Sequence, residues 1–375
     1  MRPVSRFAHV GRAPSGSGSA HGQLCLDTIS LAGSLPNVQS GGRLSLRSQR
    51  RLRLTCKQVS SLLAVEAMRG RVEEALRDAV NSDDAFLTEV ASHLIVAGGK
   101  RVRPLFAIAS AAAGGAEVTD EVVQGGVAVE LVHLGSLYHD DVIDEAPTRR
   151  TVESVNARWG NLTAILAGDF LLARASEIAA SLGTEVAGLL AATIGRLCEG
   201  EVGELRTAYN VDRTEEAYFS AIEGKTASLF ATACRIGAIV GGLPRPDVEA
   251  LTRFGLAYGM AFQIVDDVLD VTSTAEELGK PAGHDLVEGV YNLPVLRALA
   301  TSNDGLGDLL GAPIEGVELD KALGIIRSDG AVRSSLSTAR EYAATSISAL
   351  DGFRDGEGAN WLRGAVDQLF ARVAI

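Results

Sequence analysis

The chain carries the same aspartate pattern twice, and both copies lie in segments that are otherwise apolar. The pattern D-D-x-x-D occurs in "YHDDVIDE" and again in "FQIVDDVLDV". Residues four apart share one face of a helix, so the outer aspartates of each copy would point the same way. Charged side chains are costly to bury unless they are paired or bound to a metal. The fold must therefore bring both patterns to one polar cavity, and the aspartates concerned are Asp140, Asp141, Asp144, Asp266, Asp267 and Asp270.

Clustered carboxylates of this kind suit Mg²⁺, which usually completes its shell with waters and phosphate oxygens. Either cluster alone could instead be a solvated acidic helix end beside a basic loop, because short motifs have many false matches. The second copy favours metal binding, since "AFQIVDDVLDV" reads as a buried helix. Two facing clusters predict divalent ions around a diphosphate.

Helical periodicity runs from about residue 59 to the C-terminus, and strand signals are nearly absent. Several segments are rich in Ala, Gly and Leu on most faces, which indicates helices inside a large bundle. We therefore predict one all-α domain, residues 58–375, built as a single large helical bundle around a deep central cavity. The expected helices include 119–144, 161–182, 186–208, 214–240, 246–271, 291–300, 317–329, 331–353 and 358–373.

Residues 1–57 differ from the rest of the chain in charge. They hold nine Lys or Arg residues and a single acid, Asp27, whereas the whole chain has a net charge of −12. Without a sustained apolar period, this basic N-terminal extension is expected to be disordered. A transit peptide is an alternative, and so is a wrongly assigned start codon. The acidic body argues against nucleic acid as a partner.

The sequence contains no run of eighteen apolar residues, so we expect no transmembrane segment. The four cysteines form no C-x-x-C pair and no metal-binding spacing with the histidines. This pattern fits a reducing compartment without disulfides, and we predict a cytoplasmic protein.

Basic residues form a second group of candidates. In "AGGKRVRP", Lys100 and Arg103 lie between a glycine pair that ends one helix and a proline suited to the start of the next. Helix N-termini attract anions, and an arginine can bind two phosphate oxygens at once through two N–H groups. A solvated basic turn is the simpler alternative for this loop. His133 lies two helical turns before Asp140 on the same side of the helix and is a further candidate for the site. The alternative is a histidine that belongs to the core.

The motif "EGKTAS" resembles the end of a P-loop but lacks the glycine required five residues before Gly224, where Phe219 stands. Lys225 and Thr226 remain as a cation and a hydroxyl for a phosphate, with a surface lysine as the alternative. "GKPAGHD" adds Lys280 just after the second aspartate motif.

Five motifs in this order, "GGKRVRP", "HDDVIDEAPTRR", "EGKTAS", "FQIVDDVLD" and "GKPAGHDL", resemble the trans-polyprenyl (E-isoprenyl) diphosphate synthase family, in particular its bacterial long-chain members. The resemblance covers about residue 60 to the C-terminus and implies the isoprenoid synthase fold. It implies that isopentenyl diphosphate is held by Lys100, Arg103, His133 and Arg150. It implies that the allylic diphosphate is held by Arg149, Lys225, Thr226, Gln263 and Lys280. Magnesium would be bound by Asp140 and Asp144, less certainly Asp141, and by Asp266, Asp267 and Asp270.

The implied reaction is a Mg²⁺-dependent condensation of isopentenyl diphosphate with an allylic prenyl diphosphate. Breaking the allylic C–O bond leaves a carbocation and a highly charged diphosphate, which cations stabilise best in a dry site. No protein nucleophile is required. The residues predicted to be catalytic are Asp140, Asp141, Asp144, Lys225, Asp266 and Asp267.

Product length is predicted to depend on Gly135 and Ser136. They precede Asp140 by about one helical turn, about 5.4 Å or roughly one isoprene unit, and their small size implies an open tunnel and a product of about C30 to C50. The alternative is that small residues only allow close helix packing.

Two positions depart from the family pattern. Thr151 follows the arginine pair where glycine is usual, and Val290 occupies a place where many members carry a lysine. Loss of that lysine predicts weaker diphosphate binding rather than loss of activity.

Two other functions remain open from the sequence. A class I terpene cyclase shares the fold but typically carries an Asn/Ser/Glu second metal motif, and a non-catalytic regulatory subunit of a heteromeric synthase tends to lose aspartates. The resemblance further implies a homodimer and transient membrane contact for product release.

Overall fold

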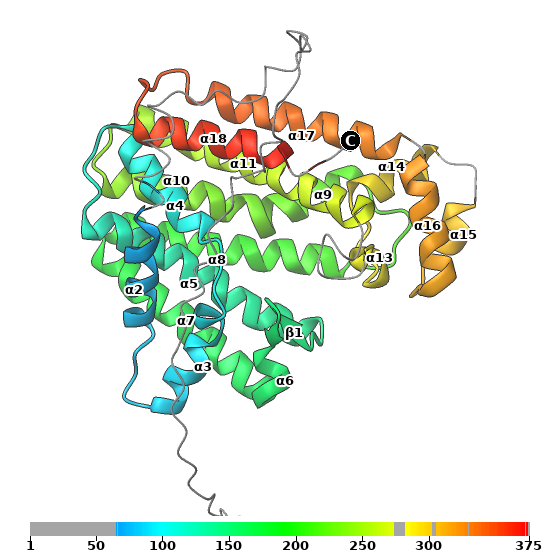
Figure 1. The fold of residues 1–375 in the computed structure, drawn as a ribbon, viewed down its shortest axis with the longest axis horizontal. Coiled ribbons are helices and arrows are strands. Elements are labelled where there is room, and N and C mark those ends of the chain that lie inside the picture. Colours follow the sequence, from blue (N-terminus) through cyan, green and yellow to red (C-terminus); the bar gives the residue numbers. More distant parts are fainter. Residues whose placement is uncertain are drawn as a thin grey trace, which may run out of the picture. The chain divides into compact units, whose positions relative to one another are not determined.

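The structure is a computed structural model that describes residues 67–273, 282–301, 305–328 and 330–371, together with Val65 and Val373. Their regular secondary structure is helical, as predicted, apart from one short hairpin (Figure 1). The predicted N-terminal extension and Lys280 lie outside the described residues. The helices are α2 (Arg69–Ala79), α3 (Ala85–Val96), α4 (Val102–Ala113), α5 (Asp120–Ile143), α6 (Val155–Trp159), α7 (Asn161–Ser181), α8 (Thr184–Leu205), α9 (Glu215–Ile222), the π-helical turn η2 (Glu223–Ala227), α10 (Ser228–Val240), α11 (Arg245–Thr272), α13 (His284–Val287), α14 (Leu293–Thr301), α15 (Leu306–Leu309), α16 (Gly316–Ser328), α17 (Ala331–Ser348) and α18 (Glu357–Ala371).

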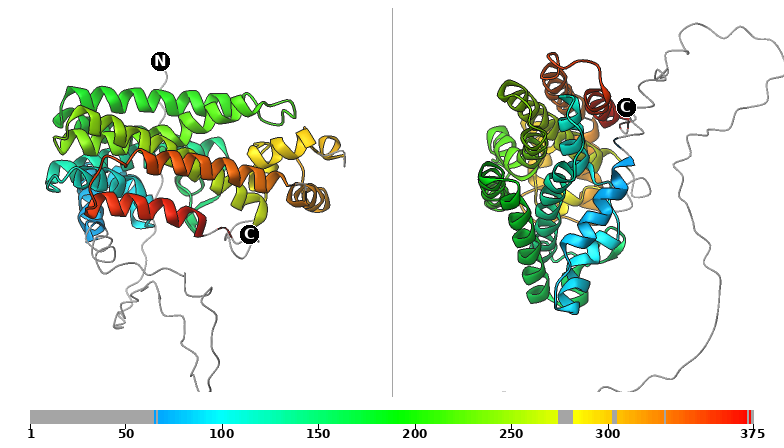
Figure 2. Two further views of the ribbon diagram at one scale, coloured as in Figure 1. Left: turned by 90° about the horizontal axis from the view of Figure 1, so that it is seen from above. Right: turned by 90° about the vertical axis from the view of Figure 1, so that its left-hand side faces the viewer.

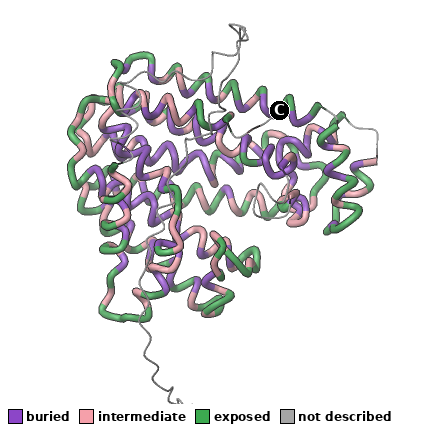
Figure 3. The backbone as a smooth tube through the Cα atoms, viewed as in Figure 1, coloured by how far each residue is buried: buried purple, intermediate pink, exposed green. Residues whose placement is uncertain are grey.

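Helix α5 lies inside the bundle and carries the first aspartate motif at its C-terminal end. It packs against α4 and α7 along its length and also contacts α2 and α10. Val127, Ala128 and Val129 follow one another at about 100° around the helix, and all three are fully buried. Most of α5 is buried in this way (Figure 3). A helix that is apolar on every side must be surrounded by protein. Gly126 allows a close approach, because an added Cβ would lie 3.0 Å from the Cα of Pro104 in α4.

Helix α11 carries the second aspartate motif and packs against α10 and α17. Its N-terminal part belongs to a core cluster in which Phe106 packs edge-on against Phe230 and Trp361. Its C-terminal part, which carries the aspartates, belongs to a second core cluster built with α14, α16 and α17. Each aspartate motif is therefore held by a helix fixed by packing on several sides, which sets the position of its carboxylates.

The chain reverses after α5 in a two-stranded antiparallel hairpin, β1 (Thr148–Arg149) and β2 (Val152–Glu153). Arg150 and Thr151 form its turn with φ of 52° and 66°. This left-handed region favours glycine and strains a β-branched residue, which explains why glycine is usual where Thr151 stands here.

The predicted helices are confirmed with some differences in their bounds. Residues 214–240 were predicted as one helix but form α9, η2 and α10, and α17 ends at Ser348 rather than at residue 353. A π-helical turn adds one residue to a helix without changing its apolar character, so periodicity does not reveal it. The hairpin and the short helices α6, α13 and α15 were not predicted, because each is too brief to show a period.

Helices α7 and α8 form a pair joined by Leu182 and Gly183, and α8 (bright green) runs along one edge of the bundle in Figure 2. None of the described helices combines the length and apolar character needed to cross a bilayer.

Candidate active site

The two aspartate motifs meet around Lys225. Lys225, Thr226, Gln263 and Asp267 line one cavity of about 140 Å³, here called the acidic cavity. Lys225 also interacts electrostatically with Asp140 and Asp144. The structure therefore brings both predicted motifs and the predicted lysine into one region, as the repeated pattern requires.

Asp140 and Asp144 lie at the end of α5, where like charges crowd. Burial, together with the neighbouring Glu201 and Asp144, raises the pKa of Asp140 to about 7, although the charge of Lys225 opposes this shift. Burial and the nearby Glu288 raise the pKa of Asp144 to about 6. A divalent cation would relieve this repulsion, so these residues fit the metal predicted from sequence.

Asp141 has a different environment from its two neighbours. Its side chain has no exposed surface and accepts a hydrogen bond of 2.6 Å from Nε of Arg149. Asp141 therefore positions Arg149, one of the predicted diphosphate ligands, and this contact is better suited to a supporting role than to direct metal binding.

The second motif is held by a chain of hydrogen bonds. Buried Asp267 accepts from the Tyr218 hydroxyl at 2.6 Å and from Nε2 of Gln263 at 2.7 Å. Oε1 of Gln263 in turn accepts from Thr226 at 2.8 Å. Burial and the neighbouring Asp285 raise the pKa of Asp267 well above its usual range. Tyr218 was not predicted from sequence.

The other two aspartates of this motif differ in exposure. Asp266 is exposed, whereas Asp270 is buried and accepts a hydrogen bond of 3.2 Å from the backbone N–H of Asp285. Among the described residues, no three acidic, His or Cys side chains are already arranged as a metal site. Phosphate oxygens of a substrate would have to complete the shell of any Mg²⁺ held here.

Two glutamates on α8 hold Lys225. Its Nζ lies 2.7 Å from Oε2 of Glu201 and 2.7 Å from Oε2 of Glu204. Burial alone would lower the pKa of Lys225, but the two carboxylates raise it above its usual value. Neither glutamate was predicted. Their only signal is the three-residue spacing in "EGEVGEL", which places both on the inner face of an otherwise Ala- and Gly-rich helix.

The residues predicted to hold isopentenyl diphosphate line a separate cavity of about 400 Å³, here called the basic pocket. Its polar lining comprises Lys100, Arg101, Arg103, Glu130, His133 and Arg150. Arg103 lies over the Phe230 ring, 4.8 Å from its centre, and burial lowers its pKa. Arg150 donates to the carbonyl oxygens of Leu94, at 3.0 Å, and Gly98. Guanidiniums converging in this way suit a diphosphate.

Arg101 and Glu130 form a buried pair that the sequence did not reveal. Arg101 has a left-handed backbone, with φ of 47°, and donates to Glu130 at 3.1 Å and to Glu73 at 2.7 Å. Burial raises the pKa of Glu130, opposed by Arg101 and Arg103. Burial and the surrounding arginines lower the pKa of His133 well below its usual range, so its imidazole is neutral near pH 7.

The two predicted chain-length residues have different surroundings. A Cβ added to Gly135 would lie 3.1 Å from the carbonyl oxygen of Gly168 and 3.3 Å from Leu172, both on α7. This geometry supports the helix-packing alternative for Gly135. Ser136 is half-buried and its hydroxyl donates to the carbonyl oxygen of His133 at 2.9 Å, so it stays a candidate for the tunnel floor.

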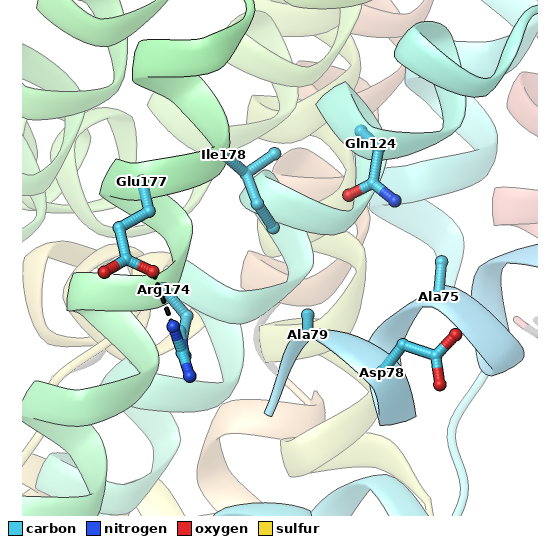
Figure 4. Close-up of a pocket in the computed structure, with 7 residues that line it drawn as sticks. All are labelled: Ala75, Asp78, Ala79, Gln124, Arg174, Glu177 and Ile178. Carbon is cyan, nitrogen blue, oxygen red and sulfur yellow. Dashed lines mark hydrogen bonds and ion pairs between the residues drawn. The ribbon is translucent and has the colours of Figure 1, made fainter. Parts of the chain in front are cut away.

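Two other cavities formed by the described residues contain none of the predicted residues. A cleft of about 340 Å³ between α2, α5 and α7 has Asp78, Gln124, Arg174 and Glu177 in its lining (Figure 4). Arg174 bonds Glu177 at 2.7 Å and the carbonyl oxygen of Asn81 at 2.7 Å. A groove of about 750 Å³ lies between α8, α9 and α17. Size alone therefore does not identify the site, whereas the convergent charges do.

The family model described as Polyprenyl synthetase matches residues 84–321. The chain belongs to this family. It is 40% identical over 314 residues to nonaprenyl diphosphate synthase of Mycobacterium tuberculosis, covering 82% of this chain and 93% of that protein. It is 40% identical to heptaprenyl diphosphate synthase component 2 of Geobacillus stearothermophilus, covering 78% and 92%. A solved polyprenyl synthase from Caulobacter crescentus, complexed with calcium and isoprenyl diphosphate, aligns with a TM-score of 0.79 at 35% identity, covering 84% and 98%.

Membership in the polyprenyl synthetase family confirms the fold and reaction class predicted from the motifs. The chain is a polyprenyl diphosphate synthase of the long-chain bacterial type, and hence a prenyltransferase with the all-α isoprenoid synthase fold. This result decides against the terpene cyclase alternative.

Proposed function

We propose that this synthase uses Mg²⁺ to extend an allylic prenyl diphosphate with isopentenyl diphosphate, giving all-trans products of about C30 to C50. The observation that carries this proposal is the presence of two anion sites of different character. Among the described residues, the basic pocket is lined by one carboxylate and several cations, whereas the acidic cavity gathers carboxylates around Lys225. One substrate would be bound by cations of the protein and the other through metal ions.

The basic pocket would hold isopentenyl diphosphate. Lys100, Arg103 and Arg150 supply positive charge, and the neutral imidazole of His133 can donate one hydrogen bond without adding charge. Because His133 and Asp140 lie on one side of α5, the helix would fix the distance between the two substrates.

The acidic cavity would hold the allylic diphosphate. Asp140, Asp144, Asp266 and Asp270 would bind Mg²⁺, which would neutralise the charge that develops on the departing diphosphate. Arg149, fixed by Asp141, and Lys225 with Thr226 and Gln263 would contact the remaining phosphate oxygens. By resemblance, the departed diphosphate accepts the proton that is lost when the new double bond forms. The buried surroundings of the carboxylates limit the access of water to the cation.

A direct experiment tests this proposal. Purified protein is incubated with Mg²⁺, farnesyl diphosphate and labelled isopentenyl diphosphate, and the extracted lipids are measured by mass. We expect all-trans chains of about six to ten isoprene units, each addition lengthening the chain within the bundle by about one helical turn. The variant Asp144→Asn should lose most activity, and extension that persists with EDTA would contradict the metal assignment.

We also propose that a second copy covers the outer face of α7 and α8. On α7, Leu162, Ile165 and Leu166 are exposed, and on α8, Val202 and Leu205 are exposed. Apolar stripes of this kind on a helix pair are typical of an interface. One relative is named as component 2 of its synthase, so a different subunit is the competing partner. Light scattering of the purified chain distinguishes the two, since a monomer alone would exclude the homodimer.

We place the enzyme in the cytoplasm, with transient membrane contact for product release.

A further inference from the structure

Arg213 is a buried arginine next to the acidic cavity that no motif identifies. It follows α8, in the loop before α9, and is only 5% exposed. Its Nη1 donates to the carbonyl oxygen of Tyr291 at 3.1 Å, and its guanidinium lies 5.8 Å from the centre of the Tyr218 ring. Its Nε and Nη2 are buried and have no hydrogen-bond acceptor within the described part of the chain. Leaving such donors unsatisfied is costly, so their position needs an explanation.

The nearest carboxylate to Arg213 is shared unequally between two cations. Oε2 of Glu204 lies 2.7 Å from Lys225, whereas Oε1 of Glu204 lies 3.9 Å from Nη2 of Arg213. The shorter contact is a hydrogen-bonded ion pair, and the longer one is too distant for a hydrogen bond. A movement of about 1 Å would bring Arg213 into hydrogen-bonding range of Glu204.

The loop that carries Arg213 is tied to the segment that covers the acidic cavity. Tyr209 donates from its backbone N–H to the carbonyl oxygen of Gly289 and from its hydroxyl to that of Val287, at 2.8 and 2.9 Å. With the Arg213–Tyr291 bond, the loop binds every second carbonyl of residues 287–291. The intervening side chains, Glu288 and Val290, line the acidic cavity. This segment therefore brings no cation into the cavity, and Lys225 is the only cation among the described residues that line it.

We propose that Arg213 is a positioning residue. It forms an ion pair with Glu204 when Lys225 leaves Glu204 to bind the allylic diphosphate. The inference rests on the proposed function of Lys225. If Lys225 left Glu204 with nothing in exchange, a largely buried carboxylate would lose its hydrogen-bonded cation, which is strongly unfavourable. Arg213 removes this cost because its free N–H groups stand beside the other oxygen of Glu204. Glu201 is the less buried of the two glutamates, so water can compensate for its loss of Lys225 more readily.

Steady-state kinetics with Mg²⁺ tests the inference by varying each substrate separately. In Arg213→Gln, we expect the KM for farnesyl diphosphate to rise about tenfold, the low end for a hydrogen bond between charged groups. The KM for isopentenyl diphosphate should stay within about twofold, because the basic pocket is untouched. Arg213→Lys keeps the positive charge but loses the planar guanidinium with its several N–H donors. It should raise the KM for farnesyl diphosphate about threefold.

A double-variant cycle identifies the partner. Since Glu204→Gln removes the charge that Arg213 would receive, adding Arg213→Gln to Glu204→Gln should raise the KM for farnesyl diphosphate much less than it does in the wild type. Arg297→Gln is the matched control, because Arg297 makes a two-bond ion pair with Glu215, at 3.0 and 3.0 Å, away from the cavity. Both KM values should be unchanged in that variant.

Three results would overturn the inference: an unchanged KM for farnesyl diphosphate in Arg213→Gln, an equal rise in both KM values, or the same rise in the Glu204→Gln background. If thermal melting shows that Arg213→Gln does not fold, Arg213→Lys decides by the same ratio of KM values. A wild-type protein that fails to extend farnesyl diphosphate would overturn the proposed function as well. An active wild type with a normal Arg213→Gln would overturn only the role of Arg213.

Discussion

Glu130 provides the sharpest test of how the basic pocket is held together. It is a carboxylate at 2% exposure on the central helix, and it accepts a hydrogen bond from Arg101 at 3.1 Å while also facing the charges of Arg103 and Arg150. Replacing it with Gln keeps the size and one acceptor but removes the negative charge. The three guanidiniums would then repel one another in a buried setting.

The size of the effect follows from the burial of both partners. Removing one side of a buried ion pair costs about 3–5 kcal/mol, and because Gln retains an acceptor we expect Glu130→Gln to lower the free energy of unfolding by about 3 kcal/mol. Glu73 is the matched control, since it bonds the same Arg101 at 2.7 Å but has 20% of its side chain exposed. Glu73→Gln should cost about 1 kcal/mol, as for more solvated pairs. Urea unfolding measures both values.

Ligand binding provides a second measurement on the same variants. A ligand at a hundred times its Kd stabilises a protein by about 2.7 kcal/mol. Isopentenyl diphosphate should stabilise Glu130→Gln more than the wild type at equal concentration, because the diphosphate then replaces the missing negative charge. The reasoning is refuted if Glu130→Gln is no less stable than Glu73→Gln, or if isopentenyl diphosphate stabilises it no more than it does the wild type.

Three further predictions concern product length, substrate affinity and pH. Ser136→Phe should shorten the products measured by mass, and an unchanged length distribution would remove Ser136 from the tunnel floor. Val290→Lys should increase the affinity for the allylic diphosphate, because it adds a cation to the acidic cavity. Val290→Ile is the neutral control. An unchanged affinity in Val290→Lys would show that this position does not affect diphosphate binding. Because the pKa of Asp140 is raised in the folded state, to about 7, the folded protein binds a proton that the unfolded chain releases above about pH 4. Metal-free protein should therefore become more stable as pH falls through 7, and urea unfolding of Asp140→Asn should lack this part of the pH dependence.

The sequence was sufficient to predict the helices and most of the converging groups, because both depend on short-range spacing. In α5 and α11, long apolar runs indicate burial, and aspartates inside such runs must face a polar cavity. The glycine pair before Lys100 marked the loop that leads into α4. These features are repeated within a few residues of one another, so no knowledge of tertiary contacts was needed.

The remaining contacts join residues far apart in the chain, and spacing does not reveal them. Glu204 bonds Lys225 because η2 and α8 cross at close range, with Gly200 so near that an added Cβ would lie 2.6 Å from the backbone nitrogen of Lys225. Tyr218 bonds Asp267 because α9 packs against α11. Gly135 was a chain-length candidate on sequence alone, but its contact with α7 supports packing. A lone charge in an apolar run, as in "VAVELVHL", was the one unused signal that pointed to Glu130.

Glu130 and Glu204 solve the same physical problem in the two proposed substrate sites. A site that binds a diphosphate must concentrate charge, yet unpaired charge in a buried place is unfavourable before the substrate arrives. In the basic pocket, Glu130 balances the guanidiniums, and in the acidic cavity, Glu201 and Glu204 balance Lys225. If the two cavities bind the substrates as proposed, each internal partner has to release its cation, and part of the binding energy is used to break these pairs. It follows that removing such a carboxylate should strengthen substrate binding while weakening the empty protein, a combination that loss of an ordinary substrate ligand cannot produce.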